Sequence, residues 1–151
     1  MIYLGADHGG FQLKEKVKEW LSEWGLEFKD MGNRLYEEGD NYPDFAFAVA
    51  SKVSEDEEKN RGILICRSAV GMVIAANKVK GVRAAAVYDG KMAEKSRQHN
   101  NSNVIGLSGD NLTETDAKKI LKTWLDTPFS DEDRHRLRVG QIEEFEKQTT
   151  G

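Results

Sequence analysis

The single cysteine of this chain, Cys66, ends a short apolar run and precedes a turn of small residues that opens a helix. A helix start offers free backbone N–H groups and the positive end of the helix dipole. Such surroundings lower the pKa of a thiol and favour the thiolate, which acts as a base or a nucleophile. A buried structural cysteine is the alternative, because free cysteine is among the most buried residue types. The position alone leaves both interpretations open.

The turn after Cys66 excludes several known chemistries. A phosphate-binding P-loop needs Gly-Lys-Ser/Thr at the start of the helix, and the chain lacks it. A C-x5-R phosphatase would need an arginine where Met72 stands, and a C-x-x-C redox pair needs a second cysteine. What remains is a thiolate that carries a proton, beside backbone N–H groups able to hold an oxyanion or a phosphate.

A second polar group, Asp7 and His8, follows the first apolar run and precedes two glycines. In the structural interpretation, Asp7 caps the next helix across a tight turn. In the functional one, both side chains face a crevice and the glycine backbone lets a ligand approach. The spacing of Gly5, Gly9 and Gly10 does not match the dinucleotide fingerprint G-x-G-x-x-G.

The segment 97–103 is rich in amide and imidazole side chains and contains His99 and Asn100. Polar loops are usually solvated surface. Both residues precede an apolar run, whereas Asp7 and Cys66 follow theirs, so one subunit would hold the two groups at opposite edges of a sheet. Either His99 is structural, or its loop bends back, or a second subunit brings it to the site. We favour the second subunit.

Two arginines near the start of the last predicted helix, Arg134 and Arg138, are spaced i and i+4 and share one helix face. That arrangement suits a phosphate group. An ordinary charged face, paired with Asp131, Glu132 and Asp133, explains them equally well.

Short apolar runs alternate with amphipathic segments along the chain. Strands are predicted at 2–6, 26–31, 62–65, 82–87 and 103–107, and helices at 11–24, 43–53, 70–78, 91–97, 113–124 and 132–146. This alternation predicts one domain over 1–151, a Rossmann-like three-layer α/β/α fold with a five-stranded parallel sheet and an extra C-terminal helix. Ligands of such folds bind at the carboxyl ends of the strands, where Asp7 and Cys66 would meet.

The composition narrows the class of protein. A formal net charge of -4 over 151 residues argues against nucleic acid or an anionic membrane as a partner. One cysteine cannot form an internal disulfide, and neither a signal peptide nor a membrane-length apolar run is expected. These features predict a soluble, cytoplasmic protein.

Several segments match a known family in the right order: Gly5–Lys14, Asp40–Asp44, Gly62–Cys66, Gly71–Met72, Ala75–Lys78, Gly81–Ala84, Ser96–Val104 and Arg134–Val139. In these segments the chain resembles the ribose-5-phosphate isomerase type B family, which includes galactose-6-phosphate and allose-6-phosphate isomerases. The resemblance spans nearly the whole chain. It implies a homodimer or dimer of dimers with the active site shared between subunits, the C-terminal helix at the interface, and no metal or organic cofactor.

The resemblance also implies a reaction, aldose–ketose isomerisation of a phosphorylated sugar through a cis-enediolate, with ribose 5-phosphate as the first candidate. Cys66 would be the base that moves the proton between C2 and C1. The turn from Arg67 to Gly71, especially Ser68 and Gly71, would line the anion hole. A second branch of the family uses a glutamate in this loop, and Met72 occupies that position here.

The other roles implied by the resemblance concern the substrate. His99 would open the furanose ring, with Asp7 and Tyr42 nearby. The remaining residues would bind substrate: Asn100 the sugar, and His8, Arg134 and Arg138 the phosphate.

The chain departs from the family pattern at the proposed site. Arg67 and Ala69 stand where the family usually has glycines, Asp110 where it has a phosphate-binding arginine, and Glu132-Asp133 where it has Gly-Gly. We hypothesise that Arg67 binds substrate and restores the positive charge lost at 110. These departures keep two alternatives open: an isomerase of another aldose phosphate, such as allose 6-phosphate or a four-carbon sugar phosphate, and a non-catalytic sugar-phosphate sensor.

Overall fold

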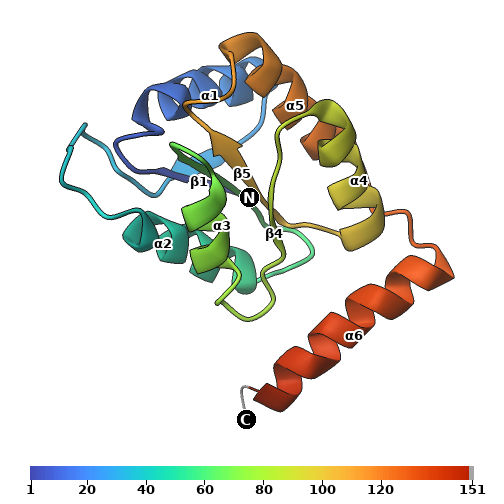
Figure 1. Ribbon diagram of the computed structural model, residues 1–151. Coiled ribbons are helices and arrows are strands. Elements are labelled where there is room, and N and C mark those ends of the chain that lie inside the picture. Colours follow the sequence, from blue (N-terminus) through green and yellow to red (C-terminus); the bar gives the residue numbers. More distant parts are fainter. Residues whose placement is uncertain (150–151) are drawn as a thin grey trace.

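A single parallel sheet with helices on both faces organises the chain in a computed structural model that describes residues 1–149 (Figure 1). The strands are β1 (Ile2–Ala6), β2 (Phe28–Asp30), β3 (Arg61–Cys66), β4 (Ala84–Ala86) and β5 (Val104–Ser108). The helices are α1 (Phe11–Glu23), α2 (Tyr42–Ser54), α3 (Val70–Ala76), α4 (Gly90–Asn100), α5 (Glu114–Asp126) and α6 (Asp133–Thr149). The predicted five-stranded α/β/α fold with an extra C-terminal helix is confirmed.

The order of the strands, β2-β1-β3-β5-β4, explains where a crevice opens. Parallel strands joined by right-handed crossovers place α1 on one face of the sheet and α2 and α3 on the other. The loops that leave β1 and β3 therefore turn to opposite faces, although the two strands are neighbours. In open α/β sheets such a reversal creates the ligand-binding crevice.

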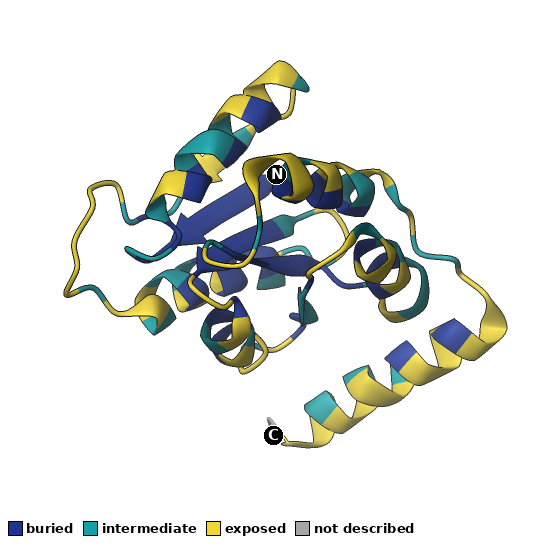
Figure 2. Cartoon of the chain, turned by 45° about the horizontal axis from the view of Figure 1, so that its top comes forward, coloured by how far each residue is buried: buried dark blue, intermediate teal, exposed yellow. Residues whose placement is uncertain are grey.

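Two apolar cores hold the layers together because successive residues of β3 point to opposite faces of the sheet. Ile63 and Ile65 pack toward α1 and α5, together with Trp124. Leu64 and Cys66 pack toward α2 and α3. Figure 2 shows the central strands buried beneath both helical layers. Burial on both faces is the reason why these strands read as continuous apolar runs.

The edge strands are shorter than the sequence predicted. The structure confines β2 to Phe28–Asp30 and β4 to Ala84–Ala86, instead of 26–31 and 82–87. Each of these strands pairs on one side only, β2 with β1 and β4 with β5, so pairing ends early and the strands remain half-exposed.

The last helix, α6, lies outside the three layers and packs beside α4 (Figure 1). It begins at Asp133 and runs to Thr149, past the predicted end at 146. His135 and Val139 are its buried side chains, whereas Leu137, Ile142 and Phe145 are exposed. Within residues 1–149, no helix has both the length and the apolar character that crossing a membrane requires.

Candidate active site

The turn after β1 packs directly against β3. A Cβ on Gly10 would lie 2.2 Å from the carbonyl oxygen of Ile65, so only glycine permits this approach. The buried Asp7 accepts a hydrogen bond from the Gly10 N–H at 3.2 Å. Burial raises the pKa of the Asp7 carboxyl, and this effect exceeds the opposing influence of Gly10 and His8. Asp7 is therefore both a turn-stabilising residue and a perturbed acid in the crevice.

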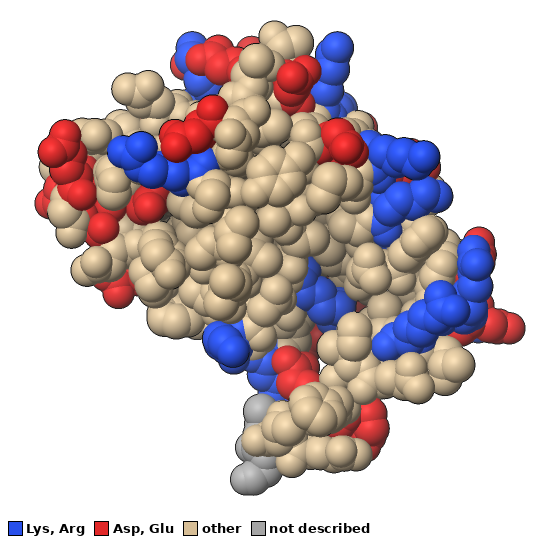
Figure 3. Space-filling model, viewed as in Figure 1, with Lys and Arg blue, Asp and Glu red and all other residues tan. Residues whose placement is uncertain are grey.

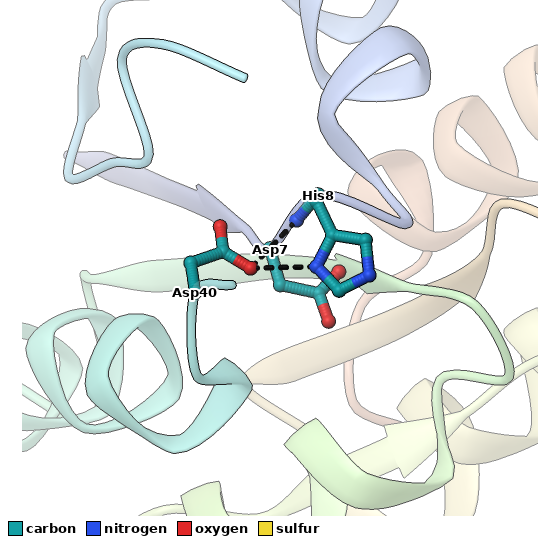
Figure 4. Close-up of side chains that lie close together, drawn as sticks. All are labelled: Asp7, His8 and Asp40. Atoms are coloured by element: carbon teal, nitrogen blue, oxygen red, sulfur yellow. Dashed lines mark hydrogen bonds and ion pairs between the residues drawn. The ribbon is translucent and has the colours of Figure 1, made fainter. Parts of the chain in front are cut away.

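His8 forms a pair with Asp40, from the loop before α2 (Figure 4). The Nδ1 of His8 lies 2.7 Å from Oδ1 of Asp40, and the His8 backbone N–H donates to the same oxygen at 3.1 Å. Burial alone would raise the pKa of the Asp40 carboxyl, but hydrogen bonds from His8 and Asn33 hold it below its usual value. The pair leaves Nε2 of His8 available to a ligand. No role was expected for Asp40 from the sequence, although Asp40 begins one of the matched segments.

The loop that carries Asp40 is anchored by a buried lysine. The ammonium of Lys14 contacts both carboxylate oxygens of Asp30, at 2.9 and 3.0 Å, and donates to the carbonyl oxygen of Asn33. The side-chain amide of Asn33 in turn donates to Oδ2 of Asp40 at 3.3 Å. A chain of polar contacts thus runs from Lys14 to His8.

Cys66 is the last residue of β3, and its side chain is buried. Burial raises the pKa of its thiol. Hydrogen bonds from the backbone N–H groups of Met72, Ala69 and Ser68 lower that pKa, whereas the nearby charge of Asp7 raises it further, and the net shift is upward. Of the two interpretations that the sequence leaves open, the isolated subunit agrees with the buried cysteine, and the lowered thiol pKa expected from the helix start is wrong there. The reason is that Cys66 belongs to the strand and the core beneath it, so the loss of solvent outweighs the favourable backbone N–H groups. The N–H groups remain in place to stabilise a thiolate once one forms.

The turn after Cys66 brings together three of the predicted residues. A Cβ on Gly71 would lie 2.8 Å from Cζ of Tyr42, so the tyrosine ring rests on the glycine. The Tyr88 hydroxyl donates to the carbonyl oxygen of Ser68 at 2.5 Å. Sequence reasoning missed Tyr88, which a loop after β4 supplies from a distant part of the chain.

The loop after β5 completes this edge of the sheet. The backbone N–H of Gly109 donates to the carbonyl oxygen of Cys66 at 2.8 Å, and that of Asp110 to Arg67 at 3.2 Å. The side chains of Arg67 and Asp110 form an ion pair at 3.7 Å. With His8 they line a cavity of about 230 Å³ that lies beside the start of α1. The predicted extra cation is therefore present, but a neighbouring anion balances it.

The remaining predicted residues lie at the opposite edge of the sheet. Because Gly62 pairs with Val104 and Cys66 with Ser108, the length of β5 separates Cys66 from the end of α4, which carries His99 and Asn100. Five residues of strand correspond to roughly 16 Å. The expectation that one subunit holds these groups apart is confirmed.

His99 is connected to the last helix. Its ring stacks on that of His135 with the centroids 4.3 Å apart, and Ser130 Oγ lies 2.6 Å from Nδ1 of His135. Arg134 and Arg138 lie exposed on α6, one before and one after His135. Arg134 contacts Glu132 at 3.1 Å, which agrees with the ordinary charged-face interpretation.

Asp7, His8 and Asp40 also form a group of three possible metal-ligating side chains, with ligand atoms within 4.8 Å of one another. Nδ1 of His8 and Oδ1 of Asp40 are already engaged with each other. We therefore interpret the group as a hydrogen-bonded Asp–His pair beside a buried carboxyl.

Comparison with known proteins identifies the family of this chain. The family model described as Ribose/Galactose Isomerase matches residues 2–142. This chain belongs to that family. It is 42% identical over 148 residues to the probable ribose-5-phosphate isomerase B of Mycoplasma genitalium, covering 98% of this chain and 97% of the relative. It is 38% identical to ribose-5-phosphate isomerase B of Mycobacterium tuberculosis, covering 97% and 90%.

Solved structures of the family share the fold over almost the full length. The crystal structure of ribose-5-phosphate isomerase B from Mycoplasma genitalium with bound ribulose-5-phosphate matches with a TM-score of 0.95 and 41% identity, covering 97% of this chain and 96% of that one. The structure of the Clostridium thermocellum enzyme matches with a TM-score of 0.92 and 41% identity, covering 98% of both. The family resemblance seen in the sequence is confirmed.

Proposed function

We propose that this protein is a sugar-phosphate isomerase that interconverts ribose 5-phosphate and ribulose 5-phosphate. The observation that carries the proposal is the meeting of Asp7, His8 and Cys66 in the crevice between β1 and β3. Two family members, 42% and 38% identical to this chain, carry the names probable ribose-5-phosphate isomerase B and ribose-5-phosphate isomerase B. A buried thiol beside backbone donors suits the transfer of a proton between adjacent carbons.

In the proposed mechanism, the Cys66 thiolate removes the proton from C2 of the open-chain aldose. The C2–H bond breaks, an S–H bond forms, and the electron pair moves to the carbonyl oxygen on C1, which gives the cis-enediolate. Ser68 and Gly71 lie in the turn whose N–H groups stabilise the developing negative charge. The thiol then returns the proton to C1, and the hydroxyl on C2 passes its proton to the oxyanion on C1. The C2–O bond becomes the ketone and the C1 oxygen becomes a hydroxyl, which leaves the Cys66 thiolate as at the start.

Phosphate binding is assigned to the cavity lined by His8 and Arg67. Its volume of about 230 Å³ accommodates a phosphate group. Asp40 fixes the ring of His8 so that Nε2 is free to contact the anion.

We assign the remaining groups to a second copy of the chain, because one subunit holds them at the far edge of its sheet. In a homodimer, the partner would supply His99 for ring opening, Asn100 for the sugar, and Arg134 and Arg138 for the phosphate. Figure 3 shows that the face over α3 and β4 carries few charged side chains, which gather toward its rim. Exposed Tyr42, Val70, Ile74 and Tyr88 lie on α2, α3 and the loop after β4. Such uncharged surface supports an interface with another copy.

Ketose formation from a panel of aldose phosphates tests the function. Ribose 5-phosphate should be converted fastest, with solvent deuterium entering the sugar at carbon. Faster conversion of allose 6-phosphate or of a four-carbon sugar phosphate would change the assigned substrate, while aldose–ketose isomerisation would remain the assigned reaction. Binding of a sugar phosphate without exchange of its carbon-bound hydrogen for solvent deuterium would instead indicate a non-catalytic sugar-phosphate sensor. Sedimentation analysis tests the dimer, and a monomer that is fully active would contradict the shared site.

A further inference from the structure

An ion pair lies at the rim of the proposed phosphate cavity. The guanidinium of Arg67 is 3.7 Å from the carboxylate of Asp110, and both residues line the cavity with His8. The two residues come from separate loops, after β3 and after β5. With the pair closed, the positive charge of Arg67 is balanced before any ligand arrives.

The backbones of both residues are held in place. The carbonyl oxygen of Arg67 accepts hydrogen bonds from the Asp110 N–H at 3.2 Å and from the Ser108 hydroxyl at 2.5 Å. A Cβ on Gly9 would lie 2.4 Å from Cγ of Arg67, so the stem of the arginine rests on the glycine backbone. The pair therefore forms at a fixed place, and only the side-chain ends can move.

The side-chain ends are weakly held. The side chain of Arg67 is 65% exposed and that of Asp110 is 53% exposed. Ion pairs this exposed contribute little net stability, because water screens the attraction and ordering two side chains costs entropy. A phosphate dianion carries a second negative charge and can form two parallel charge-assisted hydrogen bonds with an arginine. The 3.7 Å contact between Arg67 and Asp110 is longer than a hydrogen bond, so the phosphate is the stronger partner.

We propose that Asp110 is a specificity-determining residue that competes with the substrate phosphate for Arg67. Without ligand, Asp110 keeps the rim of the cavity neutral. A dianionic phosphate displaces it and takes the guanidinium, whereas a neutral sugar lacks the charge to do so. The proposal deepens the proposed function, on which it rests for the position of the phosphate.

The arrangement lowers affinity in order to gain selectivity. Asp110 occupies Arg67 and also repels the incoming anion, so its negative charge weakens phosphate binding. Removing that charge should tighten binding, and most of the gain should depend on Arg67.

Calorimetric titration of inorganic phosphate at fixed ionic strength tests the proposal. The proteins are wild type, Asp110→Asn, Arg67→Met and the double variant. Asp110→Asn should lower the Kd roughly 3- to 10-fold, and Arg67→Met should raise it. In the Arg67→Met background, Asp110→Asn should change the Kd by less than about 2-fold. The matched control is Asp126→Asn, because Asp126 forms an exposed ion pair with Lys122 on α5, at 3.2 Å.

Two results would overturn the proposal: a Kd for Asp110→Asn equal to or higher than wild type, or the same gain with and without Arg67. The KM for ribose 5-phosphate, measured on the same preparations, should fall in parallel for Asp110→Asn. If wild type forms ketose normally and Asp110→Asn has the same phosphate Kd as wild type, the role of Asp110 is refuted while the proposed function stands. Absence of both phosphate binding and ketose formation in the wild type would refute the proposed function together with it.

Discussion

Nδ1 of His8 lies 2.7 Å from Oδ1 of Asp40, which joins the turn after β1 to the loop before α2. This contact engages Nδ1 of His8, a residue that lines the cavity, and leaves Nε2 as the ring nitrogen for a ligand. Asp40→Ala should therefore raise the KM for ribose 5-phosphate by roughly 10-fold and change kcat less, as expected for lost positioning of a binding group. The control is Glu37→Ala in the same loop, which should leave KM within about 2-fold of wild type. An unchanged KM in Asp40→Ala would contradict the role of the pair.

The buried ammonium of Lys14 supports the same loop. Lys14→Met removes the buried cation from Asp30 and from the Asn33 carbonyl, which leaves Asp30 paired with the partly exposed Lys18 at 3.1 Å, and should lower the free energy of unfolding by about 3 kcal/mol. Burial raises the pKa of the Asp30 carboxyl, but Lys14 and other donors hold it below its usual value. The stabilisation from Asp30 is therefore present above its unfolded pKa and is lost as pH falls through the lower folded pKa.

Denaturant titrations between pH 7 and about pH 3 measure both effects of Lys14. Lys14→Met should show a lower stability at pH 7 and a weaker loss toward acid than wild type. Adding Asp30→Asn to Lys14→Met should recover part of the stability, because it removes a carboxylate that has lost its buried partner and keeps the partly exposed Lys18. Equal acid dependence in wild type and variant would contradict the pairing.

The raised pKa of the Cys66 thiol predicts an alkaline pH profile. Because the isolated site holds the thiol in its neutral form, kcat/KM should still increase with pH above about pH 8.5, the usual thiol pKa. Cys66→Ala should abolish ketose formation, and Cys66→Ser should lower kcat by roughly 100-fold or more, while inorganic phosphate binds to both as to wild type. A kcat/KM that is flat from neutral to alkaline pH would refute a thiol base.

The shared site predicts complementation between two inactive variants. Cys66→Ala and His99→Ala subunits, denatured together and refolded at equal amounts, should recover roughly a quarter of wild-type activity, because half of the dimers are mixed and each holds one intact site. Native mass spectrometry verifies that mixed dimers form. Mixed dimers without activity would show that Cys66 and His99 act in the same subunit.

The left-handed backbone conformation of Ala69 predicts that its replacement by glycine stabilises the protein. Its φ of 72° lies in the left-handed region, where a Cβ costs about 1–2 kcal/mol. Ala69→Gly should therefore raise the melting temperature by roughly 2 °C, even though glycine loses more entropy on folding. Ala75→Gly, inside α3, is the control and should lower it. A lower melting temperature for Ala69→Gly would contradict the strain.

Much of the fold could be predicted because its determinants are local. Apolar runs such as the one ending at Cys66 are continuous because β3 is covered on both faces, and the glycines after Asp7 mark a tight approach. The bounds of the edge strands were predicted less well, since pairing partners rather than propensity decide where β2 and β4 end.

The sequence by itself determined the family, the parallel α/β fold and the edge of the sheet where Asp7 and Cys66 meet, because hydrophobic periodicity and motif order are properties of the chain. Only the tertiary structure decided that Cys66 is buried and its thiol pKa raised, that Asp40 holds His8, and that Arg67 is paired with Asp110. Each of these depends on which distant segments pack together, because burial and charge pairing arise only from contacts between such segments.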